Sequence, residues 1–212
     1  MKAVLWDLDG VLVDSAPFHL QAWRELMASL GRELSEADFQ RTFGLRNDVV
    51  LRDLLGDLPA AEVERLGARK EALFRRAALG NIVALPGALA LLRLLRERGL
   101  KLALVSSAPE GNIDLMLGSL GVEADFDVIV GGEDVTRGKP DPEGFLLAAK
   151  RLGVPPAECV VIEDAQAGVE AAKRGGMRCV GVVGGRPRQT LERADLVVEG
   201  LDDPAVAEFF GG

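Results

Sequence analysis

The feature of this sequence that most constrains its fold is an alternation of short apolar runs with segments of helix length. The runs are almost continuously apolar, which is typical of strands covered on both faces, as in parallel sheets. The expected strands are Ala3–Trp6, Leu100–Val105, Val128–Val130, Cys159–Ile162, Cys179–Val183 and Leu196–Val198. Repeated strand–helix alternation predicts an α/β fold with a doubly wound, mostly parallel, Rossmann-like sheet.

Four of the intervening amphipathic segments are followed by a glycine, the residue that most easily adopts the left-handed backbone of a helix C-terminus. These expected helices are Ala88–Arg98, Pro109–Leu120, Pro142–Leu152 and Ala165–Arg174, and the glycines are Gly99, Gly121, Gly153 and Gly175. Each such helix would cover the sheet between two parallel strands.

One stretch interrupts the alternation, because no strand signal occurs between Ser15 and about Gly80. Apolar residues at helical spacing predict a first helix that begins near Ser15. Further helical patterns cover Glu36–Phe43, Asp48–Leu55 and Pro59–Leu79. We therefore expect an α/β core formed by residues 1–14 and 81–212, and an all-helical cap domain, residues 15–80, inserted after the first strand.

Charge and composition exclude several classes of partner. The 212 residues carry a formal net charge of −8, and no basic footprint is present, so we expect no nucleic-acid partner. No run approaches the roughly 18 apolar residues of a membrane span, and no signal-peptide pattern opens the sequence. The two cysteines lie in apolar runs and should be buried. We expect a cytoplasmic protein without a membrane partner, monomeric by default.

Polar side chains follow four of the expected strands, either directly or in the next loop. In chain order they are Asp7 and Asp9, then Ser106, then Lys139, then Glu163 and Asp164. Because the carboxyl ends of parallel strands share one edge of a sheet, where open α/β sheets bind ligands, we expect these groups to converge. The sequence thus predicts a site before any family is considered.

The residue types at this edge favour phosphoryl transfer. Several carboxylates in one place are costly to desolvate unless cations hold them, and oxygen ligands suit a hard ion such as Mg²⁺. Lys139 and Ser106 would bind the non-bridging oxygens of a phosphoryl group, and an aspartate nucleophile would form an aspartyl-phosphate. The expected partner is therefore a small phosphorylated metabolite, with Mg²⁺ as cofactor.

Four motifs, in order along the chain, resemble those of the haloacid dehalogenase (HAD) superfamily. They are Asp-Leu-Asp-Gly from Asp7, Val-Ser from Val105, Gly-Lys-Pro-Asp-Pro from Gly138 and Ile-Glu-Asp-Ala from Ile162. The resemblance extends from residue 3 to about residue 185, and the helical insertion lies where the family places its cap. It implies an enzyme with a Rossmann-like core and a helical cap.

The resemblance also implies roles for the acidic residues. Asp7 would be the nucleophile and a metal ligand. Asp9 would protonate the leaving oxygen and then activate water, while its main-chain carbonyl ligates the metal. Asp164 would supply a second metal carboxylate, and Glu163 would bind the metal directly or through water.

The remaining implied residues would hold the substrate. Ser106 and Lys139 would bind the phosphoryl oxygens. The segment around His19 resembles the first cap helix of β-phosphoglucomutases and related sugar-phosphate phosphatases, in which a matching histidine lies near the acid–base aspartate and a cap lysine. That lysine aligns with Lys70. Closure of the cap would bring these residues and Arg46 to the phosphate.

Within the superfamily, the sequence favours metal-dependent phosphate-ester chemistry. Dehalogenases and phosphonatases lack an aspartate at the position of Asp9, which this chain has, together with the Glu163-Asp164 pair. A non-catalytic module that binds phosphate and Mg²⁺ is the remote alternative, although an intact Asp9 gives no reason to expect one. Two enzyme activities therefore have to be separated, a phosphatase and a β-phosphoglucomutase.

A mutase needs a site for a second phosphate, and this chain departs from it. The positions that would supply a hydroxyl and an amide are Ala108 and Glu110, and the arginine position aligns with Asn47. Arg46, one residue earlier, would have to reach the phosphate instead. The sequence therefore favours a phosphatase acting on a sugar or polyol phosphate, with β-phosphoglucomutase as the alternative.

Overall fold

The computed structural model describes residues 1–184 and 187–211. Gly185, where the family resemblance ends, lies outside the described residues. The chain divides into two compact units, one formed by Met1–Asp14 and Val83–Gly212 and the other by Ser15–Ile82. The second unit therefore interrupts the first one directly after its first strand.

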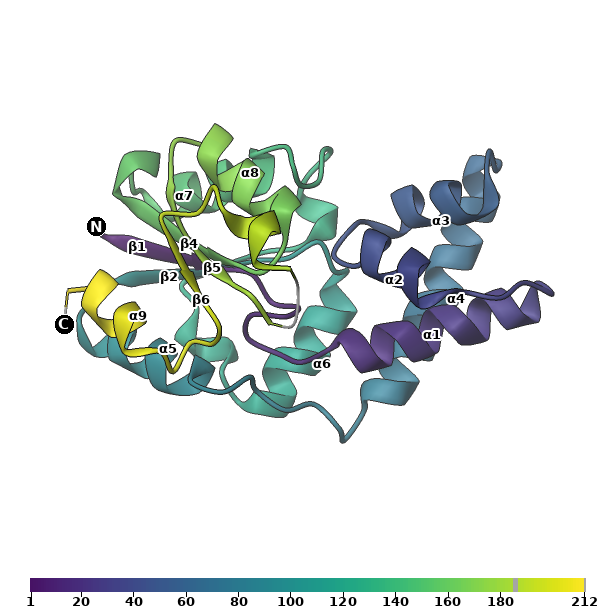
Figure 1. Cartoon of the computed structure of the whole chain (residues 1–212), viewed down its shortest axis with the longest axis horizontal. Coiled ribbons are helices and arrows are strands. Elements are labelled where there is room, and N and C mark those ends of the chain that lie inside the picture. Colours follow the sequence, from purple (N-terminus) through teal and green to yellow (C-terminus); the bar gives the residue numbers. More distant parts are fainter. Residues whose placement is uncertain (185–186, 212) are drawn as a thin grey trace. The chain divides into compact units, whose positions relative to one another are not determined.

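The first unit is built on a six-stranded parallel sheet with the order β3-β2-β1-β4-β5-β6 (Figure 1). The strands are β1 (Ala3–Trp6), β2 (Lys101–Val105), β3 (Val128–Val130), β4 (Cys159–Glu163), β5 (Arg178–Val182) and β6 (Leu196–Val198). Trp6 pairs with Leu104 of β2 and with Ile162 of β4. The expected Rossmann-like α/β core is confirmed, and β1 ends between its two neighbours.

Helices cover both faces of this sheet. They are α5 (Ala88–Glu97), α6 (Glu110–Leu120), α7 (Glu143–Leu152), α8 (Gln166–Arg174) and α9 (Pro204–Phe209), with short 3₁₀ turns at Glu123–Asp125, Gly132–Asp134, Pro156–Glu158 and Arg188–Leu191. In Figure 1, α7 and α8 lie over one face and α5, α6 and α9 over the other. Phe145 of α7 and Val169 of α8 pack with Leu5 and Val161 of the central strands. Burial on both faces explains why the strands read as continuous apolar runs.

Helix α8 ends at Arg174 as expected, but the left-handed glycine after it lies one residue later than expected. Gly121 and Gly153 adopt the left-handed backbone after α6 and α7, with φ of 66° and 68°. Gly175 has a φ of −75° and stays right-handed, and Gly176 is the left-handed residue, with a φ of 73°. Because two glycines are consecutive here, either could adopt the left-handed conformation, and the sequence alone does not decide between them.

The second unit consists of helices only, α1 (Ala16–Ser29), α2 (Glu36–Thr42), α3 (Asn47–Leu55) and α4 (Ala60–Ala78). Its apolar core contains Trp23 and Leu26 of α1, Leu51 of α3 and Leu66 of α4. The expected first helix is thus confirmed, and its buried residues, Trp23 and Leu26 among them, lie at helical spacing.

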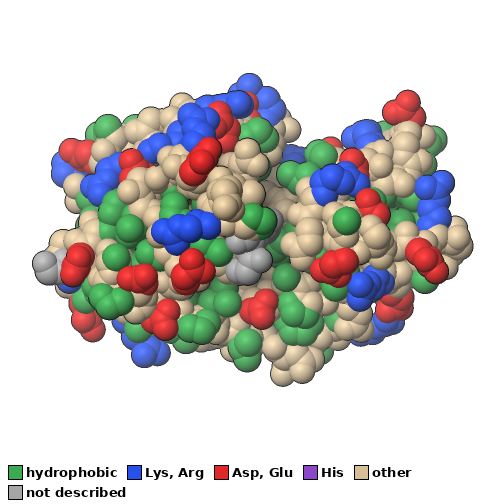
Figure 2. Space-filling view, viewed as in Figure 1, with side chains coloured by type: hydrophobic (Ala, Val, Ile, Leu, Met, Phe, Trp, Pro, Cys, Tyr) green, Lys and Arg blue, Asp and Glu red, His purple; other side chains and the backbone are tan. Residues whose placement is uncertain are grey.

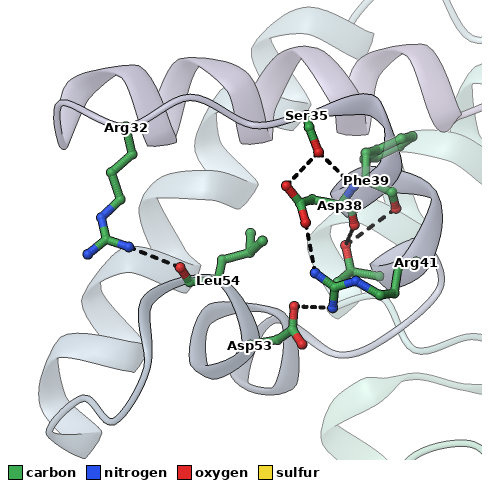
Figure 3. A network of polar contacts seen from close by, with 8 residues as sticks. Arg32, Ser35, Asp38, Phe39, Arg41, Asp53 and Leu54 are labelled. Atoms are coloured by element: carbon green, nitrogen blue, oxygen red, sulfur yellow. Dashed lines mark hydrogen bonds and ion pairs between the residues drawn. The ribbon is translucent and has the colours of Figure 1, made fainter.

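Polar contacts fix the short connections of this helical unit (Figure 3). Ser35 caps α2, because its hydroxyl oxygen accepts the Asp38 N–H at 3.1 Å and its proton is donated to the Asp38 carboxylate at 2.6 Å. Arg41 pairs with Asp38 at 2.9 Å and also with Asp53 of α3. Arg32 donates to a carbonyl near the end of α3 at 3.1 Å. The Ser35 and Arg41 hydrogen bonds lower the pKa of the Asp38 carboxyl.

Charges of both signs are interspersed on the surface of the face drawn in Figure 2.

Both cysteines, Cys159 and Cys179, are free and buried, as expected. Among the described residues, no helix combines the length and apolar character that crossing a membrane requires.

Candidate active site

Three buried carboxylates lie together at the carboxyl ends of the two central strands. Asp7 follows β1 directly, Glu163 ends β4, and Asp164 comes next. One carboxylate oxygen of each lies within 4.8 Å of the others. The exposed fractions are only 7% for Asp7, 1% for Glu163 and 4% for Asp164. The parallel register, in which Trp6 is the partner of Ile162, makes the following residues neighbours.

Lys139 connects two of these carboxylates. Its ammonium donates to Asp7 and, at 2.5 Å, to Glu163, and it lies 3.5 Å from the carbonyl oxygen of Val105 at the end of β2. Burial by itself would lower the pKa of Lys139, but the charges and hydrogen bonds of Asp7 and Glu163 raise it above its ordinary value. Lys139 is therefore held as an ammonium ion in a buried site.

The carboxylate of Glu163 is fixed on both of its oxygens. One oxygen accepts from Lys139, and the other accepts the backbone N–H groups of Asp164 at 3.0 Å and of Ala165 at 2.9 Å. Gly168, in the first turn of α8, leaves the space that this side chain fills, because a Cβ there would overlap the carboxylate. Position 168 thus requires glycine for room, not for backbone conformation.

Asp9 and Ser106 lie at the same edge of the sheet. Asp9 is half-buried and precedes Gly10, whose φ is 82° and where a Cβ would overlap Asp164. Ser106 is buried directly after β2, and its hydroxyl oxygen accepts the Ala108 N–H at 3.0 Å. Because the hydroxyl acts as an acceptor in that bond, its own proton is available to a ligand oxygen.

The electrostatics of this edge call for an additional positive charge. Burial raises the pKa of the Asp7 carboxyl well above its ordinary value. Lys139 acts in the opposite direction, while the charges of Glu163, Asp164 and Asp9 raise that pKa further. A divalent cation bound to these oxygens would favour the ionised carboxylates, and a donor set made only of oxygen suits Mg²⁺. The residues present therefore fit a magnesium ion.

The predicted binding residues of the helical unit have different surroundings. His19 of α1 and Lys70 of α4 are both buried, and Lys70 Nζ lies 2.8 Å from His19 Nδ1. Arg46 is half-buried directly before α3, where its guanidinium donates to Asp48 at 3.2 Å. The side chain of Asn47 donates to Glu71 at 2.6 Å. The structure thus brings His19 and Lys70 into contact and gives Arg46 an acidic partner in the first turn of α3.

Two acidic residues that contact or support the predicted site residues, one in each unit, were missed by sequence reasoning. Glu71 follows Lys70 on α4, and adjacent helix positions normally point in different directions, so no spacing indicated their contact. Glu143 opens α7 and accepts the backbone N–H groups of Thr136 at 3.0 Å and Arg137 at 3.1 Å. It thereby fixes the loop that carries Lys139. An acidic residue in the first turn of a helix is too common to have signalled this role.

Comparisons with known proteins agree with this geometry. The sequence model of the haloacid dehalogenase-like hydrolases matches residues 1–176. Validoxylamine A 7′-phosphate phosphatase from Streptomyces hygroscopicus subsp. limoneus is 32% identical over 202 residues, 95% of each chain. β-Phosphoglucomutase from Bacillus subtilis is 36% identical over 212 residues, 96% of this chain and 91% of the relative. The crystal structure of β-phosphoglucomutase from Clostridium difficile matches with a TM-score of 0.90 at 29% identity, covering 99% of this chain and 96% of that chain.

The space beside Glu163 can be tested with Gly168→Ala. The added methyl group would displace a buried carboxylate that has fixed partners, and overpacking of this kind costs about 1–3 kcal/mol of unfolding free energy. Gly118→Ala is the matched control, because a Cβ at Gly118 of α6 meets nothing within 4 Å and alanine favours a helix by up to about 1 kcal/mol. Denaturant unfolding followed by circular dichroism should show opposite signs for the two variants. Equal effects would contradict the steric role of position 168.

The hydrogen bonds that Glu143 accepts from the backbone of Thr136 and Arg137 predict a pH-dependent stability. Hydrogen bonds, chiefly from the Thr136 backbone, lower the pKa of the Glu143 carboxyl to about 2. Because the folded pKa lies below the unfolded one, its stabilisation is present above the ordinary glutamate pKa and is lost as the pH falls toward 2. Glu143→Gln should therefore lower Tm at pH 7, and the difference from wild type should shrink at pH 3. A difference in Tm that is constant over this range would argue against stabilisation by these hydrogen bonds. Exposed Glu97→Gln is the control.

Proposed function

The chain belongs to the haloacid dehalogenase-like hydrolase family, and we propose that it is a Mg²⁺-dependent phosphatase that cleaves a small phosphate monoester through an aspartyl-phosphate on Asp7. The observation that carries this proposal is the contact of the Lys139 ammonium with Asp7 and Glu163 inside a cluster of buried carboxylates. Phosphoryl transfer requires a nucleophile and positive charge to act on the same group, and this contact supplies both.

In the proposed first step, a carboxylate oxygen of Asp7 attacks the phosphorus of the ester. Lys139 holds the carboxylate in position through its hydrogen bond and offsets charge on the phosphoryl oxygens. The Ser106 hydroxyl donates to one of those oxygens. As the bond between phosphorus and the ester oxygen breaks, Asp9 in its protonated form donates its proton to the leaving oxygen, and the alcohol departs.

In the second step, the phosphoryl group leaves Asp7. The Asp9 carboxylate, which has lost its proton, takes one from a water molecule as that water attacks phosphorus. The bond between phosphorus and the Asp7 oxygen then breaks, and inorganic phosphate is released while Asp7 and Asp9 return to their starting states.

The proposed metal ligands are Asp7, Asp164 and the main-chain carbonyl of Asp9. When bound, Mg²⁺ supplies positive charge that reduces the repulsion between these carboxylates and the phosphate. Glu163 already has hydrogen-bond partners on both oxygens, which favours an interaction with the ion through water. Its proposed task is then to hold Lys139 in place.

The surroundings of α6 favour a phosphatase over a mutase. The sequence resemblance places the second phosphate of a mutase near Ala108 and Glu110, at the start of this helix. Ala108 is buried, and the carboxylate of Glu133 accepts the Glu110 N–H at 3.2 Å. A carboxylate at this helix start, next to the acidic Glu110, would repel a phosphate. Asn47, which aligns with the arginine of a mutase, donates to Glu71 instead.

We propose further that the helical unit, residues 15–80 in the sequence-based boundaries, is a cap that determines the substrate. His19 and Lys70 are its proposed substrate-binding residues, and Arg46 is proposed to contribute a positive charge. The names of two relatives, a validoxylamine A 7′-phosphate phosphatase and a β-phosphoglucomutase, favour a phosphorylated sugar or polyol as the substrate class.

The nucleophile assignment is tested by phosphate release from a panel of sugar and polyol phosphates. Asp7→Asn keeps the shape of the side chain but removes its nucleophilic charge, so kcat should fall by at least about 10³-fold. Asp14→Asn removes the same charge from an exposed position of the same segment and should retain activity. Substantial turnover by Asp7→Asn would refute the mechanism. Conversion of β-glucose 1-phosphate into glucose 6-phosphate with little free phosphate would instead support the mutase.

The metal proposal makes a separate prediction. Excess EDTA should abolish turnover, because the buried carboxylates then lack the charge that lets them accept a phosphate, and added Mg²⁺ should restore it. Asp164→Asn should raise the Mg²⁺ concentration that gives half-maximal rate, whereas exposed Asp202→Asn should leave it unchanged. Undiminished turnover in EDTA would exclude a metal requirement.

A further inference from the structure

A continuous network of polar side chains is buried inside the helical unit. Lys70 Nζ lies 2.8 Å from His19 Nδ1 and 2.9 Å from Glu71 Oε1. The same oxygen of Glu71 accepts from the side chain of Asn47 at 2.6 Å. The side chains of Lys70 and Glu71 are only 3% and 7% exposed. Three of the four helices, α1, α3 and α4, therefore contribute to one network.

The stability of the unit does not explain this network. A buried ion pair pays a desolvation cost that its mutual attraction often fails to exceed, so apolar residues of similar volume would serve at least as well. The unit already has an apolar core around Trp23 and Leu66. A charged pair retained at such a place is better explained by what it does to its neighbour, and that neighbour is His19.

The network determines which nitrogen of His19 carries the proton. The lysine ammonium is a donor with no acceptor lone pair, so His19 Nδ1 must accept and the ring proton lies on Nε2. Glu71 pairs with the Lys70 ammonium at 2.9 Å. Burial alone would raise the pKa of the Glu71 carboxyl, but the charge of Lys70 and the hydrogen bonds from Lys70 and Asn47 help to hold it below its ordinary value. The ring is also held in place, since it stacks on Phe74 with centroids 4.0 Å apart and meets Phe43 edge-on at 5.9 Å.

We propose that Glu71, held by its hydrogen bond from Asn47, is a positioning residue that acts through Lys70 to keep His19 as the neutral imidazole with its proton on Nε2. His19 then has a single ring N–H, on Nε2 and in a fixed direction, with which to act in the proposed reaction. The tautomer follows from contacts inside the helical unit alone, whereas the effect on turnover rests on the proposed function of His19 in substrate binding.

The sequence offers an unusually direct measurement, because His19 is its only histidine. In the full-length, tag-free protein with ¹⁵N-labelled histidine, nitrogen chemical shifts at pH 7.5 report the tautomer without any assignment problem. Wild type should show a single Nε2–H tautomer. Glu71→Gln removes the charge that holds Lys70, so a mixture of tautomers should appear and kcat/KM should fall about tenfold, the scale of losing a partner that orients a functional histidine.

Glu25→Gln is the matched control for this experiment. Glu25 of α1 pairs with Arg76 of α4 at 2.6 Å, so the substitution makes the same charge change between the same two helices but at an exposed place. It should alter neither the tautomer nor kcat/KM. Glu71→Asp retains the charge and should recover the single tautomer and part of the lost activity. If Glu71→Gln fails to fold, Asn47→Ala takes its place. This variant removes the hydrogen bond to Glu71 without removing a charge.

Two results would overturn the proposal. An unchanged Nε2–H tautomer in folded Glu71→Gln would show that Glu71 does not position the ring, and a changed tautomer with unaltered kcat/KM would show that the positioning has no part in turnover. Failure of the proposed phosphatase function is recognised separately, by the absence of phosphate release from wild type. In that case the nitrogen shifts still decide whether Glu71 controls the tautomer.

Discussion

The contact of the Lys139 ammonium with Asp7 and Glu163 is the interaction on which the proposed chemistry of the α/β unit depends. A parallel sheet collects the ends of its strands along one edge, and in this chain those ends carry carboxylates that repel one another. Lys139 offsets part of that charge from a loop that Glu143 holds in place. Gly168 leaves room for Glu163, so the lack of a side chain at this position of α8 also serves this contact.

Among the described residues, buried Lys70 of the helical unit and largely buried Lys139 of the α/β unit each pair with a glutamate, and the two pairs differ in what surrounds them. Lys139 faces a cluster of three carboxylates, and its single charge leaves that cluster short of positive charge, which fits a site that takes up a metal ion. Lys70 faces one carboxylate and an imidazole, so its charge is matched within the helical unit. The first arrangement is suited to binding charged ligands, whereas the second is suited to orienting a neutral donor.

The sequence predicted the elements whose signal is repeated and missed those whose signal is a single contact. The strands were found because burial on both faces makes every residue of a run apolar. Helix α9 was missed because its six residues are too few to show a helical period, and Asp203, which accepts the Ala205 N–H at 2.9 Å, is a cap typical of many short turns. Asp7 and Asp164 were brought to one place by topology that the pattern already contained. The contact of Glu71 with Lys70 depends on the side-chain conformations that these two residues adopt in the packed unit, and residue spacing in the sequence does not encode those conformations.

The same distinction explains why phosphoryl-transfer chemistry is easier to infer than the choice between a phosphatase and a mutase. The groups proposed for phosphoryl transfer lie at strand ends, whose positions follow from the sheet order. The features that favour a phosphatase are individual substitutions without periodicity, such as Glu110 beside Glu133 at the start of α6. Asn47 links this choice to the buried network, because the side-chain amide at the position where the resemblance implies a mutase arginine donates to Glu71 at 2.6 Å. An arginine there would bring a second cation to Glu71 and compete with Lys70 for its carboxylate. We therefore expect the loss of a second phosphate site and the orientation of His19 to be two consequences of one residue choice.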